Sequence, residues 1–143
     1  MTFVLDASVA LTWLLRDAST RDTAYAFAIL KTLGVPDASA EVPVTWSLEI
    51  ANVVARCEAK ETVTALQTSA YLEVLRDVPI EPDADTHAFA LGATLELARR
   101  YGLSSYDASY LELALRRGLP LASLDKDLTK AARRAGVKRF QAP

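Results

Sequence analysis

The chain has 143 residues, of which 51% are hydrophobic and 24% charged, and its formal net charge is −2. This length predicts one domain, over residues 1–143, with enough apolar residues for an ordinary core. No apolar run is long enough to cross a membrane, no secretory signal peptide is recognisable, and the lone Cys57 excludes an intrachain disulfide. We therefore expect a soluble cytoplasmic protein.

The small net charge conceals an uneven distribution. Residues 1–98 carry 6 basic and 14 acidic side chains, whereas residues 99–143 carry 10 basic and 4 acidic ones. Such asymmetry is found on surfaces that bind nucleic acid or an acidic partner. Alternatively, Arg116, Arg117 and the pair Arg133–Arg134 lie at helix ends, where positive charge offsets the helix dipole. Charge alone favours this second interpretation.

The N-terminal elements are a short buried strand and two helices. The strand covers Phe3-Val4-Leu5 and ends on Asp6. A helix over residues 7–15 follows, and a second covers 20–33 and ends at Gly34.

The central elements are two short strands and three helices. Pro43 donates no backbone hydrogen bond, so the strand that contains it must be brief. The elements are a strand at 41–44, helices at 45–60 and 63–76, a strand at 78–81 and a helix at 83–101. Ala84, Ala88, Leu91, Leu95 and Ala98 predict the buried face of the last helix.

The C-terminal elements are helices at 104–117 and 126–135 and strands at 119–124 and 137–140, the last of them at a sheet edge. The sequence Ser104-Ser105-Tyr106-Asp107 has the form of a capping box. Because helices separate the strands along the chain, we expect an α/β fold with a parallel sheet.

Four carboxylates fall where a parallel sheet brings side chains together. Asp6 and Asp125 end strands, and Glu49 and Asp107 lie early in helices, whose side chains lean towards the helix start. All four can therefore reach one cleft at the carboxyl edge of the sheet, where ligands of open α/β sheets bind.

Four carboxylates in one cleft repel each other unless a cation lies among them. Oxygen ligands without nearby His or Cys suit a hard ion, so we expect Mg²⁺ or Mn²⁺. Such an ion acts on phosphate oxygens and water, which makes a phosphodiester the natural substrate.

Each acid taken singly has a simpler explanation. Asp6 and Asp125 can cap the helices that follow them, and Asp107 can be the third residue of the capping box. Glu49 has no basic residue one helical turn away. The metal-site hypothesis gains force only from the four acids together.

Four further polar residues are candidates for supporting roles. Asn52 lies one turn past Glu49, where it can orient that carboxylate or a water. The hydroxyls of Ser8 and Ser123 lie two residues from Asp6 and Asp125 and can hold a water, or can be ordinary polar groups at element ends. Asp127 can exchange roles with Asp125.

The chain resembles PIN-domain ribonucleases, specifically the toxin component of VapBC-type toxin–antitoxin pairs. The matching segments, in the family's order, are Phe3–Ser8, Val42–Asn52, Leu103–Ala114 and Leu119–Leu128. The resemblance extends over essentially the whole chain. It places the acidic set at Asp6, Glu49, Asp107 and Asp125, with Ser123 where the family commonly has Thr or Ser.

The resemblance implies a three-layer α/β/α sandwich around a central, mostly parallel sheet of four to five short strands. It also implies metal-dependent endonucleolytic cleavage of RNA, often structured RNA such as tRNA. A homodimer and a small antitoxin that blocks the active site are the implied protein partners.

Two other classes of function remain as alternatives. A receiver-like signalling domain also has an aspartate at a strand end, but it usually has two adjacent acids after the first strand and a lysine after a late one. Here Asp6 precedes Ala7-Ser8, and Asp125 stands where a lysine is expected. A catalytically inactive subunit that only binds a partner is the second alternative, against which the intact set of acids argues.

Overall fold

Four short parallel strands form the centre of the fold. The computed structural model describes residues 1–143. The strands are β1 (Thr2–Leu5), β2 (Ser39–Val42), β3 (Ile80–Pro82) and β4 (Leu121–Ala122), in the sheet order β3-β2-β1-β4. All three pairings are parallel, so the predicted α/β fold with a parallel sheet of four to five strands is confirmed, with four.

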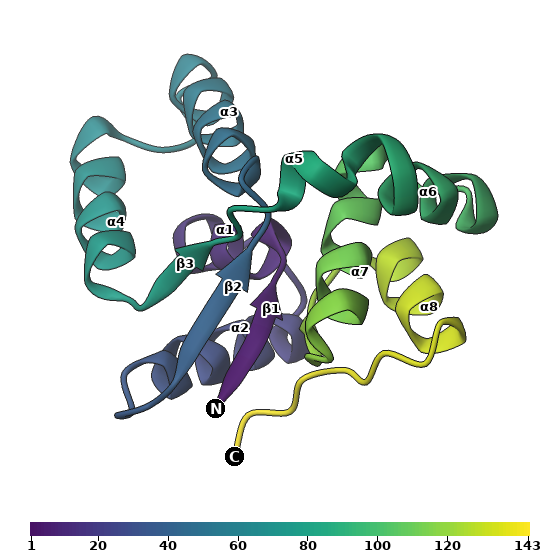
Figure 1. The fold of residues 1–143 in the computed structure, drawn as a ribbon. Helices are drawn as coiled ribbons and strands as arrows, with labels where there is room; N and C mark the ends of the chain where they lie inside the picture. The colour runs from purple at the N-terminus through teal and green to yellow at the C-terminus, as the bar shows by residue number, and fades with distance from the viewer.

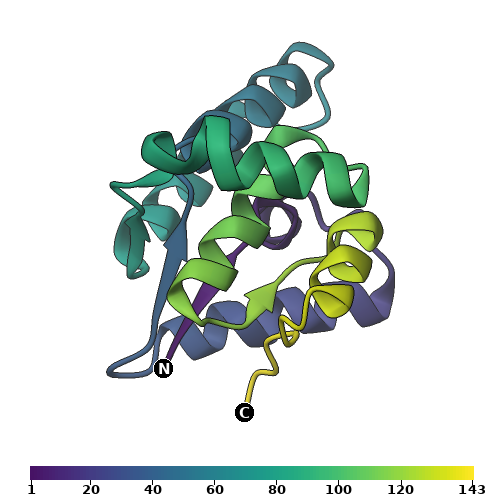
Figure 2. The ribbon, with the colours of Figure 1, turned by 45° about the vertical axis from the view of Figure 1, so that its right-hand side comes forward.

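Helices flank this sheet. They are α1 (Ala7–Leu15), α2 (Thr20–Leu33), α3 (Trp46–Ala59), α4 (Ala65–Asp77), α5 (Thr86–Phe89), α6 (Leu95–Tyr101), α7 (Ser105–Arg117) and α8 (Lys126–Arg134). Figures 1 and 2 show α2 behind the sheet and α7 in front of it, with α3 and α4 to one side. No helix combines the length and apolar character that crossing a membrane requires.

The core is built on the first strand. Phe3, Val4 and Leu5 are completely buried, as expected for a parallel strand covered on both faces. They belong to a cluster of 27 buried apolar residues that also includes Phe140, whose ring stacks on Phe3 with 3.9 Å between centroids. The C-terminal segment therefore packs against the first residues of the chain.

Prolines explain why two strands differ from their predicted bounds. The strand predicted at 41–44 lies at Ser39–Val42, and Pro43 follows it. The strand predicted at 119–124 contains only Leu121–Ala122. Pro120 accepts a hydrogen bond from Val4 (2.9 Å) but has no N–H to donate, so the ladder begins after it.

The predicted edge strand at 137–140 is reduced to one bridge, between Leu121 and Arg139. Val137 and Phe140 are buried, but the segment makes too few ladder bonds to count as a strand. It runs beside β4 as an extended tail.

The helix predicted over 83–101 is wrong as one continuous helix. It consists of α5, a π-helical segment (Ala90–Thr94) and α6. A π turn holds more residues than an α turn, so it shifts the apolar face out of phase. The predicted buried face is also wrong, because Leu91 is 87% exposed and Ala84 and Ala88, which precede the π-helical segment, are exposed as well.

The topology places the ends of the strands at one edge. All strands run in the same direction, and α1, α3 and α8 begin at or just after the carboxyl ends of β1, β2 and β4. This edge lies near the top of the sheet in Figure 1, where α3 and α5 begin. The predicted acids lie in or beside the first turns of these helices and of α7.

Candidate metal-dependent active site

Asp6 is the most buried acid of the predicted set. It follows β1 directly and is only 4% exposed. Its Oδ2 accepts hydrogen bonds from Ser8 Oγ (2.6 Å) and Ser123 Oγ (2.7 Å). Asp6 precedes α1 but makes no side-chain cap to it. The carboxylate is therefore directed across the sheet edge rather than into its own helix.

The two serines connect the ends of β1 and β4. Ser8 Oγ accepts a hydrogen bond from Leu124 N (3.0 Å), and Ser123 Oγ accepts one from Asp125 N (3.0 Å). Each hydroxyl thus accepts from the β4 segment and donates to Asp6. Their observed role is to hold Asp6 in one orientation.

Asp125 acts as a helix cap in the structure. Its Oδ1 accepts a hydrogen bond from Leu128 N (2.8 Å) at the start of α8. The carboxyl is half-buried. Capping and a place beside Asp6 are therefore compatible at this position.

Glu49 is held by Tyr110, a residue to which the sequence alone assigned no role. Tyr110, fully buried on α7, donates its hydroxyl hydrogen to Glu49 Oε1 (3.2 Å) and accepts from Ala7 N (3.4 Å). Burial, followed by the negative charges of Asp6 and Glu49, raises the pKa of the Tyr110 phenol, so it remains a donor. Its position three residues after Asp107, on the same helix face, was the available signal.

Asp107 is the acid with the fewest protein partners. Ser104 caps α7 by accepting from Asp107 N (3.1 Å), and its hydroxyl also lowers the pKa of Asp107, but the Asp107 carboxylate does not bind the Ser104 backbone N–H in return. The predicted capping box is therefore only half formed. The half-buried Asp107 carboxylate stays free for another ligand.

The acids influence each other electrostatically. Burial, and then the negative charge of Asp6, raises the pKa of Glu49 to about 7. Burial and the charges of Asp125 and Asp6 raise the pKa of Asp107 to about 6. Burial also raises the pKa of Asp6; the serine hydrogen bonds oppose this, and the charge of Asp125 adds to it. Like charges that raise each other's pKa favour a cation among them.

The carboxylates do not form a finished set of metal ligands. No three Asp, Glu, His or Cys side chains are arranged as a group that could hold an ion. Three of the four acids instead accept hydrogen bonds from the protein: Asp6 from Ser8 and Ser123, Glu49 from Tyr110, and Asp125 from Leu128 N. The oxygens of these carboxylates and serine hydroxyls are nevertheless the kind of ligand that a hard divalent ion prefers. Metal binding by the four acids stays a prediction.

Two of the predicted supporting residues, Asn52 and Asp127, lie exposed at the margin of the acidic site. Asn52 is exposed and makes no hydrogen bond with Glu49, so the predicted orienting contact is absent; Tyr110 makes that contact instead. Asp127 is exposed in the first turn of α8 and adds to the charges that raise the pKa of Asp107.

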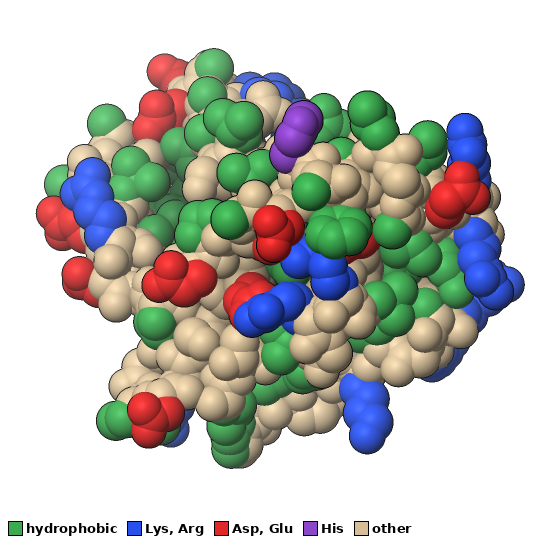
Figure 3. All heavy atoms as spheres, in the orientation of Figure 1, with side chains coloured by type: hydrophobic (Ala, Val, Ile, Leu, Met, Phe, Trp, Pro, Cys, Tyr) green, Lys and Arg blue, Asp and Glu red, His purple; other side chains and the backbone are tan.

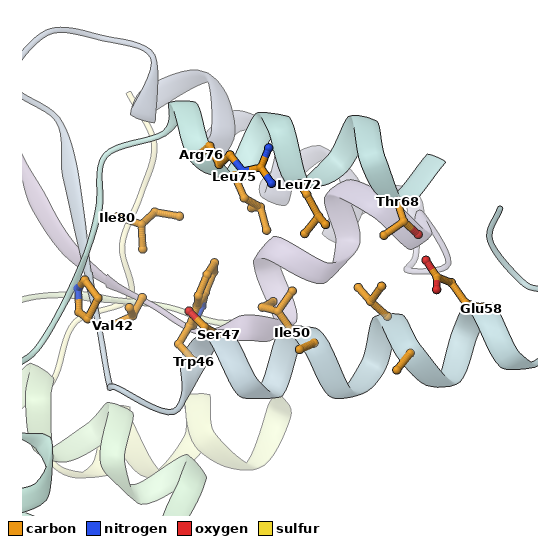
Figure 4. A pocket seen from close by; sticks show the side chains of 14 residues that line it. Val42, Trp46, Ser47, Ile50, Glu58, Thr68, Leu72, Leu75, Arg76 and Ile80 are labelled. Atoms are coloured by element: carbon orange, nitrogen blue, oxygen red, sulfur yellow. The ribbon is translucent and has the colours of Figure 1, made fainter. Parts of the chain in front are cut away.

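A large apolar groove lies apart from the acids, between α3 and α4. Figure 4 shows Trp46 and Ile50 of α3 facing Leu72 and Leu75 of α4, with Ile80 at one end. The groove has a volume of about 560 Å³. Trp46 Nε1 and Thr68 Oγ1, from opposite walls, are buried without a hydrogen-bond partner.

Comparisons with known proteins agree with this architecture. A family model described as the PIN domain matches residues 3–134. Among solved structures, the crystal structure of PAE2754 from Pyrobaculum aerophilum is similar, with a TM-score of 0.63 and 21% identity, over 92% of this chain and 87% of that one. At this identity the likeness shows the fold alone. No curated protein matches the chain.

Proposed function

Because the chain belongs to the PIN domain family, we propose that it is a Mg²⁺- or Mn²⁺-dependent endoribonuclease whose catalytic acids are Asp6, Glu49, Asp107 and Asp125. The PIN domain is generally a metal-dependent nuclease fold, and such domains suggest RNA binding. This family assignment does not favour the receiver-like and inactive-subunit alternatives.

The orientation of Asp6 is the observation that carries the proposal. Both serine hydroxyls bond Oδ2 of this nearly buried carboxylate, so Asp6 is held in one orientation and Oδ1 is left for another ligand. Glu49 and Asp107 add negative charge nearby, as their raised pKa values show. Such an arrangement costs stability on its own, which a bound cation offsets.

The residues of the chain have separable roles in this proposal. A bound Mg²⁺ or Mn²⁺ supplies Lewis acidity towards phosphate oxygens and water. Ser8 and Ser123 fix the Asp6 carboxylate, and Tyr110 fixes Glu49. Glu49, which a cation bound nearby would keep ionised, can accept a proton from the attacking water. Water attacks phosphorus in line, and the 3′ oxygen leaves.

Metal binding and cleavage test the proposal together. The chain should cleave RNA with Mn²⁺ and not with EDTA, and Mn²⁺ at about 100 times its Kd should stabilise it by about 2.7 kcal/mol. Asp6→Asn should abolish both effects. The exposed Asp17 provides a matched control, since Asp17→Asn should retain both. A chain that neither cleaves RNA nor responds to Mn²⁺ would refute the assignment.

We further propose that the protein is the cytoplasmic toxin of a toxin–antitoxin pair, acts as a homodimer on RNA such as tRNA, and is blocked by a small antitoxin. The groove between α3 and α4 supports a protein partner, because a segment bound against Trp46 would lie one helical turn from Glu49. Expression without a partner should arrest growth, and Asp107→Asn should relieve the arrest. Normal growth with the unmodified chain would contradict the toxin role but not the nuclease.

A further inference from the structure

A hollow beside α8 gathers positive side chains from three parts of the chain. We propose that this α8 basic hollow binds the backbone phosphates of the RNA next to the cleaved bond, an inference that rests on the proposed nuclease function. Its volume is about 370 Å³. Its basic lining residues are Arg21 of α2, Lys126, Lys130 and Arg133 of α8, and Arg139 of the C-terminal segment.

None of these five cations forms an ion pair, whereas three of the six other basic residues of the C-terminal third do. Elsewhere in that third, Arg116 pairs with Asp83 and Glu112, Arg117 with Glu41, and Arg99 with Glu96. Figure 3 shows Lys and Arg side chains along the right-hand side of the molecule, where α6 and α8 lie in Figure 1. The α8 basic hollow is therefore distinguished by five unpaired cations that line one hollow together, rather than by the overall excess of positive charge.

The α8 basic hollow borders the acidic site directly. Ser123 and Leu124 also line it. Ser123 Oγ donates to Asp6 Oδ2 (2.7 Å), and Leu124 N donates to Ser8 Oγ (3.0 Å). An RNA phosphate in the hollow would thus lie beside Ser123, which is itself a hydrogen-bond partner of Asp6.

A second hollow extends the surface away from the acids. It has a volume of about 510 Å³, is also lined by Lys138 and Gln141, and shares Thr129, Arg133 and Arg139 with the first. The two hollows therefore adjoin and lead from the acidic edge to the C-terminal segment. A nucleic-acid strand carries one phosphate per nucleotide and therefore fits such an elongated basic surface.

Arg139 is held in place for this role. Its guanidinium lies over the ring of Tyr25, 4.0 Å from the centroid. Tyr25 also donates its hydroxyl hydrogen to the carbonyl of Phe140 (2.8 Å), which fixes the segment against α2. Stacking on the ring holds the guanidinium at the hollow, where its five N–H donors exceed what Tyr25 can accept and can also bind phosphate oxygens.

The lining favours nucleic acid over an acidic protein partner. Of the nine residues around the α8 basic hollow only one is hydrophobic, and Asp22 is the only acid. A protein partner normally needs apolar anchor pockets, which this surface lacks. The adjacent acids repel phosphate, so a substrate needs cations beside them, and the hollow supplies these.

Binding to a labelled single-stranded RNA tests the proposal. The measurement uses the Asp6→Asn chain in EDTA, so that the RNA is not cut. Replacing Lys130 and Arg133 with Gln should remove two phosphate contacts, which lowers the slope of log K against log salt by about 1.4 and weakens binding about 25-fold at 0.1 M salt. The control replaces Arg99 and Arg100 of α6 with Gln, makes the same change in net charge, and should alter Kd less than twofold.

Each outcome has a defined meaning. Unchanged affinity and salt slope, or an equal loss in the α6 control, overturns the proposal. An α8 variant that loses affinity for an oligoglutamate peptide but binds RNA as before would also overturn the proposal. Cleavage by the unmodified chain with Mn²⁺ is measured in parallel: weakened binding in the α8 variant without any cleavage would contradict the nuclease and leave the binding surface standing. Melting temperatures of both variants should match that of the parent, because all four residues are exposed.

Discussion

At the residue scale, Tyr110 connects three elements of the acidic site. Its side chain extends from α7, its hydroxyl donates to Glu49 on α3, and it accepts from Ala7 at the start of α1. Because the residue is completely buried, the hydroxyl has no access to water as a substitute partner. One oxygen atom thus fixes the relative placement of α3 and the loop after β1.

We predict that Tyr110→Phe raises the pKa of Glu49 above its value of about 7. The hydrogen bond from Tyr110 lowers this pKa, so its removal leaves burial and the charge of Asp6 less opposed. The free energy of unfolding should fall by about 1 kcal/mol. Titration of the Glu49 carboxyl carbon by NMR, in EDTA, measures the shift.

Tyr71 provides the control for this prediction. It is also buried and donates its hydroxyl hydrogen to a backbone carbonyl, at Ala10 (2.7 Å). Tyr71→Phe should cost similar stability without moving the pKa of Glu49. A Glu49 titration that is the same in both variants would show that Tyr110 does not control this acid.

The same scale shows what the sequence could predict about the acids. Asp6, Asp107 and Asp125 all stand at helix starts, and capping was an alternative for each. Asp125 does cap its helix, whereas Asp6 binds serines and Asp107 does not complete the capping box. Spacing along the chain locates such residues, but the choice of partner depends on tertiary contacts that no local pattern encodes.

At the element scale, a buried ion network joins α7 to the segment before α5. Arg116 of α7 binds Asp83 at 2.6 Å and Glu112 at 2.7 Å, and its guanidinium lies over the ring of Phe89. Burial raises the pKa of Asp83, but the hydrogen bonds from Arg116, Asp85 N and Thr86 outweigh it, so the pKa is lowered overall. The network therefore holds the irregular α5–π–α6 segment against the helix that carries Asp107.

We predict that Arg116→Gln destabilises the protein by about 2 kcal/mol, because it leaves Asp83 and Glu112 without their counter-ion in a network that solvent reaches in part. The side chains of these acids are only 8% and 5% exposed. Urea unfolding at pH 7 measures the loss. Arg99→Gln breaks the exposed pair with Glu96 and should cost less than 1 kcal/mol. Equal losses in the two variants would contradict a special role for the network.

The same segment marks a limit of sequence-based prediction. Helical spacing of Ala84, Ala88 and Leu91 predicted one regular helix, but Asp83 pairs with Arg116 and α5 starts only at Thr86. A long-range ion pair and a π segment set the phase here, and neither leaves a periodic signal. By contrast, β1 and α1 were predicted closely because a short apolar run and helical spacing describe them fully.

At the scale of the whole molecule, the acidic site acts against stability. One cluster of 27 buried apolar residues, from Phe3 to Phe140, supplies the core, and a single domain over residues 1–143 stays a prediction. The site adds carboxyls whose pKa values lie above those of the unfolded chain, at about 7 for Glu49 and about 6 for Asp107, against 4.5 and 3.8. Folding therefore becomes less favourable as these groups ionise.

The sign of this effect gives the final prediction. Between about pH 4 and pH 7 the folded state binds more protons than the unfolded state, so the free energy of unfolding falls as pH rises through this window in EDTA. Glu49→Gln and Asp107→Asn remove the ionisation and should each stabilise the protein at pH 7.5 by about 1 kcal/mol, a value reduced for partial exposure, with little effect at pH 4. Urea unfolding at both pH values measures this, with Glu73→Gln as an exposed control. Mn²⁺ should reverse the order at pH 7.5, because only the unmodified chain retains the full set of oxygen ligands. Variants that are less stable than the parent at pH 7.5 in EDTA would mean that these carboxylates stabilise the fold, and the electrostatic case for a cation among them would then fail.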